Sequence, residues 1–198
     1  KSGADVRLGQ RATADQVLEL KPDAVIVATG ARPRIPELPG LVRERALIAR
    51  DVLMGRAVPG QRVAIAGGGQ VGVATAEFLS LMDKNVTILE MEDTLAPDLV
   101  YGRRYWTLAD LADHDVGVLT NAMVRGMEDG NVRIKHDGHE ETIGPFDDIV
   151  LSMGYEPNAT LAHELEGRVP VLYTIGDAVE ARTAVEAIAE GAKTARMI

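Results

Sequence analysis

The chain has 198 residues, no cysteine and a formal net charge of −9. A chain of this length can bury a sizeable core in one domain or two. Its acidity argues against general binding to nucleic acids or anionic membranes, which need clustered lysine and arginine. The lack of cysteine excludes a disulfide, a thiolate metal site and a redox-active dithiol within these residues.

No apolar run approaches the roughly 20 residues that a membrane helix needs, and no signal peptide is visible. We therefore expect a cytoplasmic protein with no membrane partner. The chain starts at Lys1 rather than at a methionine, and we expect it to be a fragment of a larger protein.

The first 56 residues predict short elements around a linker. The expected elements are a strand at Asp5–Leu8, a helix over Thr13–Leu20 with Thr13 as its cap, a buried strand at Asp23–Gly30 and a short helix over Asp51–Gly55 capped by Asp51. The prolines of residues 31–40 forbid a helix or a central strand and favour an extended crossing segment.

A glycine loop follows an apolar strand at Arg62–Ala66 and opens a helix. Gly67 would form the tight turn, Gly69 would let the backbone approach a pyrophosphate, and Gly72 would let the helix pack close to the sheet. The free N–H groups of the helix N-terminus favour an anion. The candidate nucleotide-binding residues of this loop are Gly67, Gly68, Gly69, Gln70, Val71 and Gly72. The alternative is that these glycines only tighten a turn in an unrelated α/β protein.

The next strand, Asn85–Leu89, supports nucleotide binding because Glu90 follows it, about 20 residues past the loop. Glu90 can accept hydrogen bonds from the adenosine 2′- and 3′-hydroxyls. Glu92 and Asp93 come soon after, with no lysine or arginine nearby to receive a 2′-phosphate. We therefore favour NAD(H) over NADP(H).

The rest of the chain predicts a third parallel strand, an antiparallel meander and a closing helix. The expected elements are a helix between Pro97 and His114 with Tyr101, Tyr105, Leu108 and Leu111 facing inward, strands at Val116–Leu119, Ala122–Met127, Asn131–Lys135, Glu140–Ile143, Asp148–Gly154 and Val169–Ile175, and a helix over Thr183–Met197. Asp129-Gly130 and Asp137-Gly138 are hairpin signals. His136, His139 and Glu140 surround an exposed turn, so we predict no metal site.

Four motifs occur in an order that resembles the two-dinucleotide-binding-domain flavoproteins, in which an NAD(P) domain interrupts an FAD lobe. The motifs are Ala28-Thr29-Gly30, the fingerprint from Gly67 to Ala76, Gly154–Asn158 and Tyr173–Asp177. Within that superfamily, the runs Ala49–Leu53, Leu89–Asp98 and Gly176–Arg182 are similar to the carboxy-terminal half of the 2,4-dienoyl-CoA reductase and 2-enoate reductase group. That group resembles NADH:flavin oxidoreductases of the old-yellow-enzyme type and trimethylamine dehydrogenase.

The resemblance implies an α/β fold: a Rossmann-like NAD(P)-binding domain, with a parallel sheet plus an antiparallel meander, inserted in a partial FAD-binding Rossmann-like lobe. Residues 57–158 would form the NAD(H)-binding domain. Residues 1–56 would be a partial FAD-lobe segment with the crossing linker, and residues 159–198 the C-terminal FAD-lobe segment.

The resemblance also implies an NADH-dependent flavin oxidoreductase. Hydride would pass from NADH to FAD, and electrons would continue through an iron–sulfur cluster to an N-terminal FMN-bearing barrel, neither of which lies in this chain. Asp177 would bind an FAD ribitol hydroxyl, and its alternative role is that of an ordinary helix cap. Gly176 would allow the backbone to approach the FAD closely. Ala28, Thr29, Gly30 and Gly154 would end strands where a dinucleotide or the interdomain link passes.

One position departs from the family. Many relatives carry glutamate near the nicotinamide and flavin where this chain has Ala74, and we assign no catalytic residue. The alternative function is therefore a non-catalytic ADP- or NAD-binding and electron-transfer scaffold of a flavin dehydrogenase, and we expect the isolated fragment to be inactive. The final substrate would be set by the absent barrel.

Overall fold

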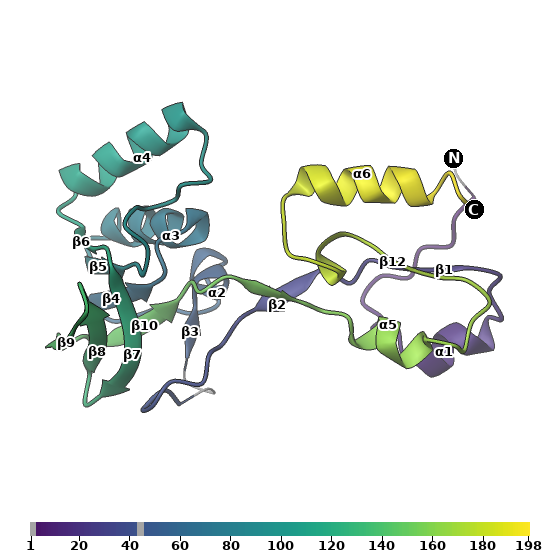
Figure 1. Ribbon diagram of the computed structural model, residues 1–198, viewed down its shortest axis with the longest axis horizontal. Coiled ribbons are helices and arrows are strands. Elements are labelled where there is room, and N and C mark those ends of the chain that lie inside the picture. Colours follow the sequence, from purple (N-terminus) through teal and green to yellow (C-terminus); the bar gives the residue numbers. More distant parts are fainter. Residues whose placement is uncertain (1–2, 43–45) are drawn as a thin grey trace. The chain divides into compact units, whose positions relative to one another are not determined.

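The computed structural model describes residues 3–42 and 46–198, and the chain forms two compact units (Figure 1). The first unit combines the segment that ends at Arg32 with Tyr155–Ile198, and the second unit is Pro33–Gly154. Residues 33–56, expected to belong with the FAD-lobe segment and crossing linker, fall within the second unit.

The second unit is built on a five-stranded parallel sheet. In spatial order its strands are β3 (Leu47–Ile48), β10 (Asp148–Leu151), β4 (Arg62–Ala66), β5 (Asn85–Leu89) and β6 (Gly117–Leu119). Ile65 of β4 pairs with Ile88 of β5 and Val150 of β10. Because β4 and β10 are buried on both faces, they read as continuous apolar runs in the sequence. The short strand β3 gives no such signal and was not predicted.

Three helices contribute to the core on one face of this sheet: α2 (Ala49–Leu53), α3 (Gln70–Ser80) and α4 (Tyr101–Asp113). Figure 1 shows α3 between α4 and the strands. Val73, Ala76 and Leu79 of α3 pack with Ile65 and Ile88 of the sheet. Buried apolar side chains at helical spacing therefore fix the helix on the sheet.

The predicted inward face of α4 is partly wrong. Leu111 is buried and Leu108 packs against the core, but Tyr101 and Tyr105 are 82% and 59% exposed. Arg104 turns inward instead: its Nε donates to the Leu95 carbonyl at 2.8 Å, and its Nη2 donates to Thr94 Oγ1. These bonds set the rotation of the helix and leave both tyrosines on the outside.

The predicted cap of α2 is also wrong. The helix begins at Ala49, its N-cap is Ile48, and no side chain caps it. Asp51 lies inside the helix, where its carboxylate is 3.6 Å from the Arg56 guanidinium. Its backbone carbonyl accepts hydrogen bonds from the N–H groups of Arg56 and Ala57, so the residue stabilises the helix end rather than its start.

An antiparallel meander contributes to the core on the other face of the sheet. It consists of β7 (Ala122–Glu128), β8 (Asn131–His136) and β9 (His139–Ile143). Both turns have two consecutive residues with positive φ, at Asp129-Gly130 and Asp137-Gly138, as type I′ hairpins require. The predicted meander, and with it the predicted α/β class, is confirmed.

The first unit contains a two-stranded parallel sheet of β1 (Val25–Val27) and β12 (Leu172–Thr174). Its helical elements are α1 (Ala14–Glu19), α5 (Thr160–Leu165), the 3-10 turn η2 (Gly176–Ala178) and α6 (Ala184–Thr194). Thr13 and Thr183 cap α1 and α6 in reciprocal capping boxes. Residues 5–8 form no strand, contrary to expectation.

Two short strands join the units: β2 (Ala31–Pro33) pairs with β11 (Tyr155–Pro157). The Arg34 N–H donates to the Gly154 carbonyl at 3.0 Å, and the Asn158 N–H donates to the Gly30 carbonyl at 2.9 Å. Because the later residue of one strand meets the earlier residue of the other, the strands run in opposite directions.

Among the described residues, no helix is long and apolar enough to cross a membrane.

Candidate nucleotide-binding site

The glycine loop between β4 and α3 is shaped by close packing of the backbone. Gly67 has φ +103°, and a Cβ there would lie 2.2 Å from the Ser152 carbonyl oxygen. A Cβ on Gly72 would lie 2.0 Å from the Gly67 carbonyl oxygen, and one on Gly68 would lie 2.3 Å from Leu95 Cδ2. Gly67 and Gly72 are therefore required by the fold itself, whatever the loop binds, whereas a methyl group on Gly68 would have to displace the end of the Leu95 side chain.

Gly69 differs from its neighbours because a Cβ there would meet no protein atom within 4 Å. It is the N-cap of α3, and the Val73 N–H donates to its carbonyl at 3.0 Å. Within residues 3–42 and 46–198, the N–H groups of Gln70, Val71 and Gly72 have no hydrogen-bond partner. The first turn of α3 thus presents free donors beside open space, the arrangement that receives a phosphate.

Glu90 lies at the carboxyl end of β5 and is only 9% exposed. Its Oε2 accepts a hydrogen bond from the Gly68 N–H at 2.5 Å, and its Oε1 accepts one from the Glu92 N–H at 2.9 Å. The carboxylate therefore holds the glycine loop to the end of β5. Each oxygen can still accept a further bond, for example from a ligand hydroxyl.

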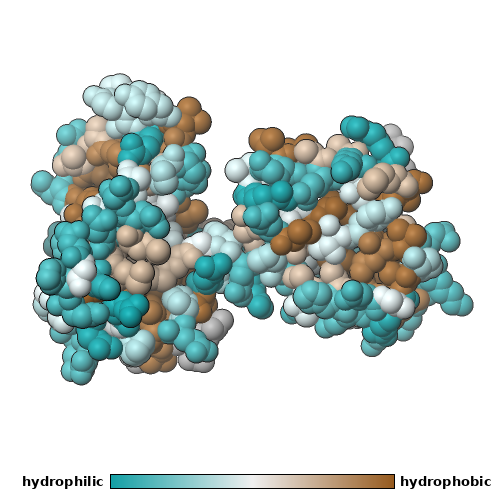
Figure 2. All heavy atoms as spheres, viewed as in Figure 1, coloured by the Kyte–Doolittle hydropathy of each residue, from teal (hydrophilic) through white to brown (hydrophobic). Residues whose placement is uncertain are grey.

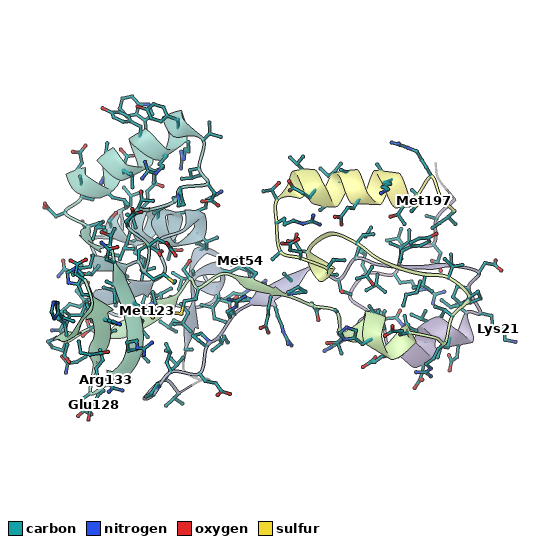
Figure 3. The ribbon with its side chains drawn as sticks, in the orientation of Figure 1. Lys21, Met54, Met123, Glu128, Arg133 and Met197 are labelled. Carbon is teal, nitrogen blue, oxygen red and sulfur yellow. The ribbon has the colours of Figure 1, made fainter. Side chains whose placement is uncertain are left out.

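A cavity of about 420 Å³ lies at the carboxyl ends of β4, β5 and β10 and is lined by Gly67 and Glu90 among other residues. Its lining residues are Arg34, Pro36, Leu38, Gly67, Leu89, Glu90, Met91, Ala122, Met123, Val124, Ser152 and Met153. Figure 3 shows Met123 toward one end of β7 and Glu128 at the other, so the cavity lies at the Met123 end of the meander. The carboxyl edge of an open parallel sheet is where such folds bind ligands.

The candidate residues of the first unit meet at the carboxyl edge of the two-stranded sheet. The Ile175 N–H donates to the Val27 carbonyl at 3.0 Å, which places Ala28 beside the start of η2. Thr29 Oγ1 donates to the Asn158 carbonyl at 2.5 Å, and Gly30 follows with φ +70°. These contacts tie the strand end to the segment after β11.

Gly176 and Asp177 form the start of η2. The Gly176 N–H donates to the Glu190 carboxylate at 2.6 Å, and Asp177 Oδ1 accepts a hydrogen bond from the Arg182 N–H at 3.2 Å. The Arg182 side chain also pairs with Glu190. Its guanidinium and the Gly176 N–H lower the pKa of the Glu190 carboxyl. Glu190 thus stays charged and fixes the turn that carries Asp177.

Of the residues that line the cavity, the sequence predicted Gly67 and Glu90 as site residues but none of the others, among them Arg34, Met123, Ser152 and Met153. Arg34 belongs to the crossing segment, Met123 to β7, and Ser152 and Met153 to the end of β10. The repeated strand-to-glycine pattern at residues 148–154 is a signal that could have drawn attention to Ser152 and Met153. Arg34 and Met123 have no comparable local pattern.

The glycine loop, the open N-terminus of α3 and the acidic residue after β5 define a Rossmann-like dinucleotide-binding domain. The chain belongs to the pyridine nucleotide-disulphide oxidoreductase family, whose sequence model matches residues 2–191. It is thus part of an oxidoreductase family, although its own sequence has no cysteine.

Similar proteins include several reductases. A metal reductase of Desulforamulus reducens is 31% identical over 94% of this chain and 33% of its own length. A bilirubin reductase of Mediterraneibacter gnavus is 31% identical over 98% of this chain, and a cinnamate reductase of Clostridium sporogenes 29% identical over 99%, each match covering 30% of the relative. The chain therefore spans about a third of the length of these curated relatives.

Solved structures agree with the membership of this family. A 2-naphthoyl-CoA reductase complex superposes with a TM-score of 0.88 at 27% identity, over 99% of this chain and 30% of that one. Histamine dehydrogenase from Rhizobium sp. 4-9 has a TM-score of 0.80 over 96% of this chain and 31% of its own; at 18% identity it shows the shared fold. The predicted resemblance to two-dinucleotide-domain flavoproteins is confirmed.

Proposed function

We propose that the second unit binds NAD(H) across the carboxyl edge of its parallel sheet. The observation that carries this proposal is the combination of free N–H donors and open space at the start of α3 with a buried Glu90 that lines the cavity at the same edge of the sheet. The N–H groups would hold the pyrophosphate, and Glu90 would accept hydrogen bonds from the adenosine ribose.

The proposal favours NAD(H) over NADP(H) on electrostatic grounds. Glu90 ends β5, and Glu92 and Asp93 follow it as exposed acids. A 2′-phosphate would approach these carboxylates, and the arginine that reaches this loop, Arg104, already donates to Thr94 Oγ1 and the Leu95 carbonyl rather than offsetting the repulsion. The ribose hydroxyls of NAD(H) face no such cost.

The first unit would be the later part of an FAD lobe. Gly176 allows close backbone approach, Asp177 would accept a hydrogen bond from a flavin ribitol hydroxyl, and Ala28–Gly30 would line the same edge. Bound together, the nicotinamide and the flavin supply the redox chemistry, a hydride transfer from the former to the latter. In the intact protein, electrons would then pass through an iron–sulfur cluster to a barrel domain that carries FMN.

A binding-only role is the second candidate, and Ala74 is the observation that favours it. This residue is partly exposed on α3 and supplies no carboxylate at the position where the resemblance to the flavoprotein family implies glutamate. Within the described residues, the cavity is lined by one acid, Glu90, which is already bonded to the backbone on both oxygens.

Calorimetry and anaerobic stopped-flow mixing separate the two candidates. We expect the intact protein to bind NAD⁺ more tightly than NADP⁺ and to lose flavin absorbance when mixed with NADH. Tight NAD⁺ binding without bleaching of the flavin would support the scaffold role. If the protein bound neither nucleotide, both candidates would be wrong.

A further inference from the structure

Arg34 stands out as a cation without a partner at the edge of the cavity. Its side chain is exposed and lines the same cavity as Gly67 and Glu90. In the part of the chain that the structure describes, it makes no side-chain hydrogen bond or ion pair. An unpaired guanidinium at the opening of a pocket is available to a ligand.

The backbone holds Arg34 in place without help from its side chain. Its N–H donates to the Gly154 carbonyl at 3.0 Å, Pro33 precedes it, and Pro36 follows two residues later. The prolines restrict the backbone of this segment. Arg34, Pro36 and Leu38 all line the cavity, the alternation expected of an extended chain. The guanidinium therefore approaches the cavity from a fixed point.

Arg34 reaches the cavity from the face of the sheet opposite α3. Ile35 and Leu38 pack on the core that contains Ala66 and Leu151, whereas α3 packs on the core that contains Ile65. Neighbouring residues of one strand point to opposite faces. A ligand lying across the carboxyl edge would thus have the N–H groups of α3 on one side and Arg34 on the other.

The position of Arg34 along the edge of the sheet indicates that its ligand group is the pyrophosphate. In the order β10-β4-β5, Gly154 follows β10, the glycine loop follows β4 and Glu90 follows β5. Ribose bound at Glu90 places the pyrophosphate over the loop, next to the strand end that anchors Arg34. A 2′-phosphate would instead lie on the Glu90 side, with Glu92 and Asp93.

Four other cations of the second unit already have partners within the described structure. Arg62 pairs with Asp147, Lys84 donates to the carbonyls of Pro59 and Gly60, Arg103 pairs with Glu77, and Arg104 bonds Leu95 and Thr94. Among the residues that line the cavity, Arg34 alone carries a positive charge.

We propose that Arg34 binds the pyrophosphate of the dinucleotide and acts with the N-terminus of α3 as a two-sided clamp. The inference rests on the proposed NAD(H) site and adds a residue to it. Guanidinium donors match phosphate oxygens in a bidentate geometry that an ammonium group cannot reproduce. The clamp would also supply the positive charge that the glycine loop itself lacks.

The test measures binding of NAD⁺, NADP⁺, ADP and adenosine to the intact protein by calorimetry, or by competition for the weaker ligands. We expect Arg34→Gln to weaken NAD⁺ and ADP by about tenfold or more and to leave adenosine unchanged. Arg34→Lys should give an intermediate loss. Arg125→Gln is the matched control, because Arg125 is an exposed cation near Met123 that does not line the cavity.

Unchanged binding of NAD⁺ and ADP by Arg34→Gln would overturn the inference while leaving the NAD(H) site standing. Equal losses for ADP and adenosine would also overturn it, since they would indicate a structural effect, and a loss confined to NADP⁺ would assign Arg34 to a 2′-phosphate instead. If the wild-type protein bound no NAD⁺, the proposed function would fail and this inference with it.

Discussion

The two edges of the parallel sheet in the second unit use their polar groups in opposite ways. At the amino edge, Asp147 Oδ2 accepts hydrogen bonds from the N–H groups of Gln61 and Arg62 at 3.0 and 2.8 Å, and Oδ1 accepts one from Arg62 Nη2 at 2.9 Å. At the carboxyl edge, donors of the α3 first turn and the Arg34 guanidinium have no partner among the described residues.

The polar groups of the amino edge therefore contribute to the stability of the sheet, and those of the carboxyl edge are left for binding. Polar groups that are satisfied within the protein hold the strands in register, and unsatisfied groups at a surface opening are available to a ligand. Substitutions at the two edges should therefore change different measured quantities.

Both units also expose scattered apolar side chains (Figure 2), among them Val185 and Ile188 of α6.

The largest effect is expected within the glycine loop, from Gly72→Ala. The new Cβ would lie 2.0 Å from the Gly67 carbonyl oxygen, and the loop would have to move. We expect the free energy of unfolding to fall by about 3 kcal/mol or more, measured by denaturant titration, with loss of NAD⁺ binding.

Gly69→Ala is the matched control for that substitution. Gly69 has φ −67°, and its Cβ would meet no protein atom within 4 Å, so stability should change by less than about 0.5 kcal/mol. The methyl group would occupy the space proposed for the pyrophosphate, and NAD⁺ affinity should fall by about tenfold or more. Unchanged affinity in a stable Gly69→Ala protein would count against the proposed site.

A smaller effect is expected from Glu90→Gln, which tests the ribose end of the carboxyl edge. Loss of charge-assisted hydrogen bonds to the ribose should weaken NAD⁺ by about 10- to 100-fold. NADP⁺ should lose less, since one repelling charge is removed, so the preference for NAD⁺ should narrow. Glu92→Gln is the control, because its side chain has no hydrogen bond in the described structure and should change NAD⁺ affinity little. A preference that stayed unchanged in Glu90→Gln would contradict the assigned role.

The loop and Glu90 could be predicted because their geometry is local. A strand, a glycine turn, a helix and a second strand follow one another in the chain, and each step restricts the next. Arg34 and Met123 are far apart in sequence and come together only through the packing of the crossing segment and the meander on the sheet. Periodicity and spacing contain no information about such an encounter.

At the amino edge, Asp147→Asn should lower stability by less than Gly72→Ala and leave NAD⁺ affinity unchanged. Hydrogen bonds from Arg62 lower the pKa of the Asp147 carboxyl from its usual value of 3.8. A lowered folded-state pKa contributes stability above the unfolded value, and this contribution is lost as pH falls through the folded value. Denaturant titrations at pH 7, 5 and 3 should therefore show a constant difference between wild type and variant at pH 7 and 5, which narrows only at pH 3, below the usual pKa of 3.8. A difference that stayed constant down to the lowest pH or grew on acidification would contradict this.

The smallest effect is expected from Tyr105→Ala on α4, where two helical patterns compete in the sequence. One pattern runs through Tyr101, Tyr105 and Leu108, and the other through Arg104, Leu108 and Leu111. Hydrophobicity favours the first pattern, but the bonds from the half-buried Arg104 guanidinium to Thr94 and Leu95 select the second, because a cation taken out of water needs hydrogen-bond partners.

Tyr105 is 59% exposed, so Tyr105→Ala should change the free energy of unfolding by less than about 0.5 kcal/mol. Leu111, which is 2% exposed, provides the contrast, and Leu111→Ala should cost about 2–5 kcal/mol. Denaturant titration of both variants measures the two losses of stability, from which the face that α4 buries follows. Equal losses would place Tyr105 in the core, as hydrophobicity alone suggests.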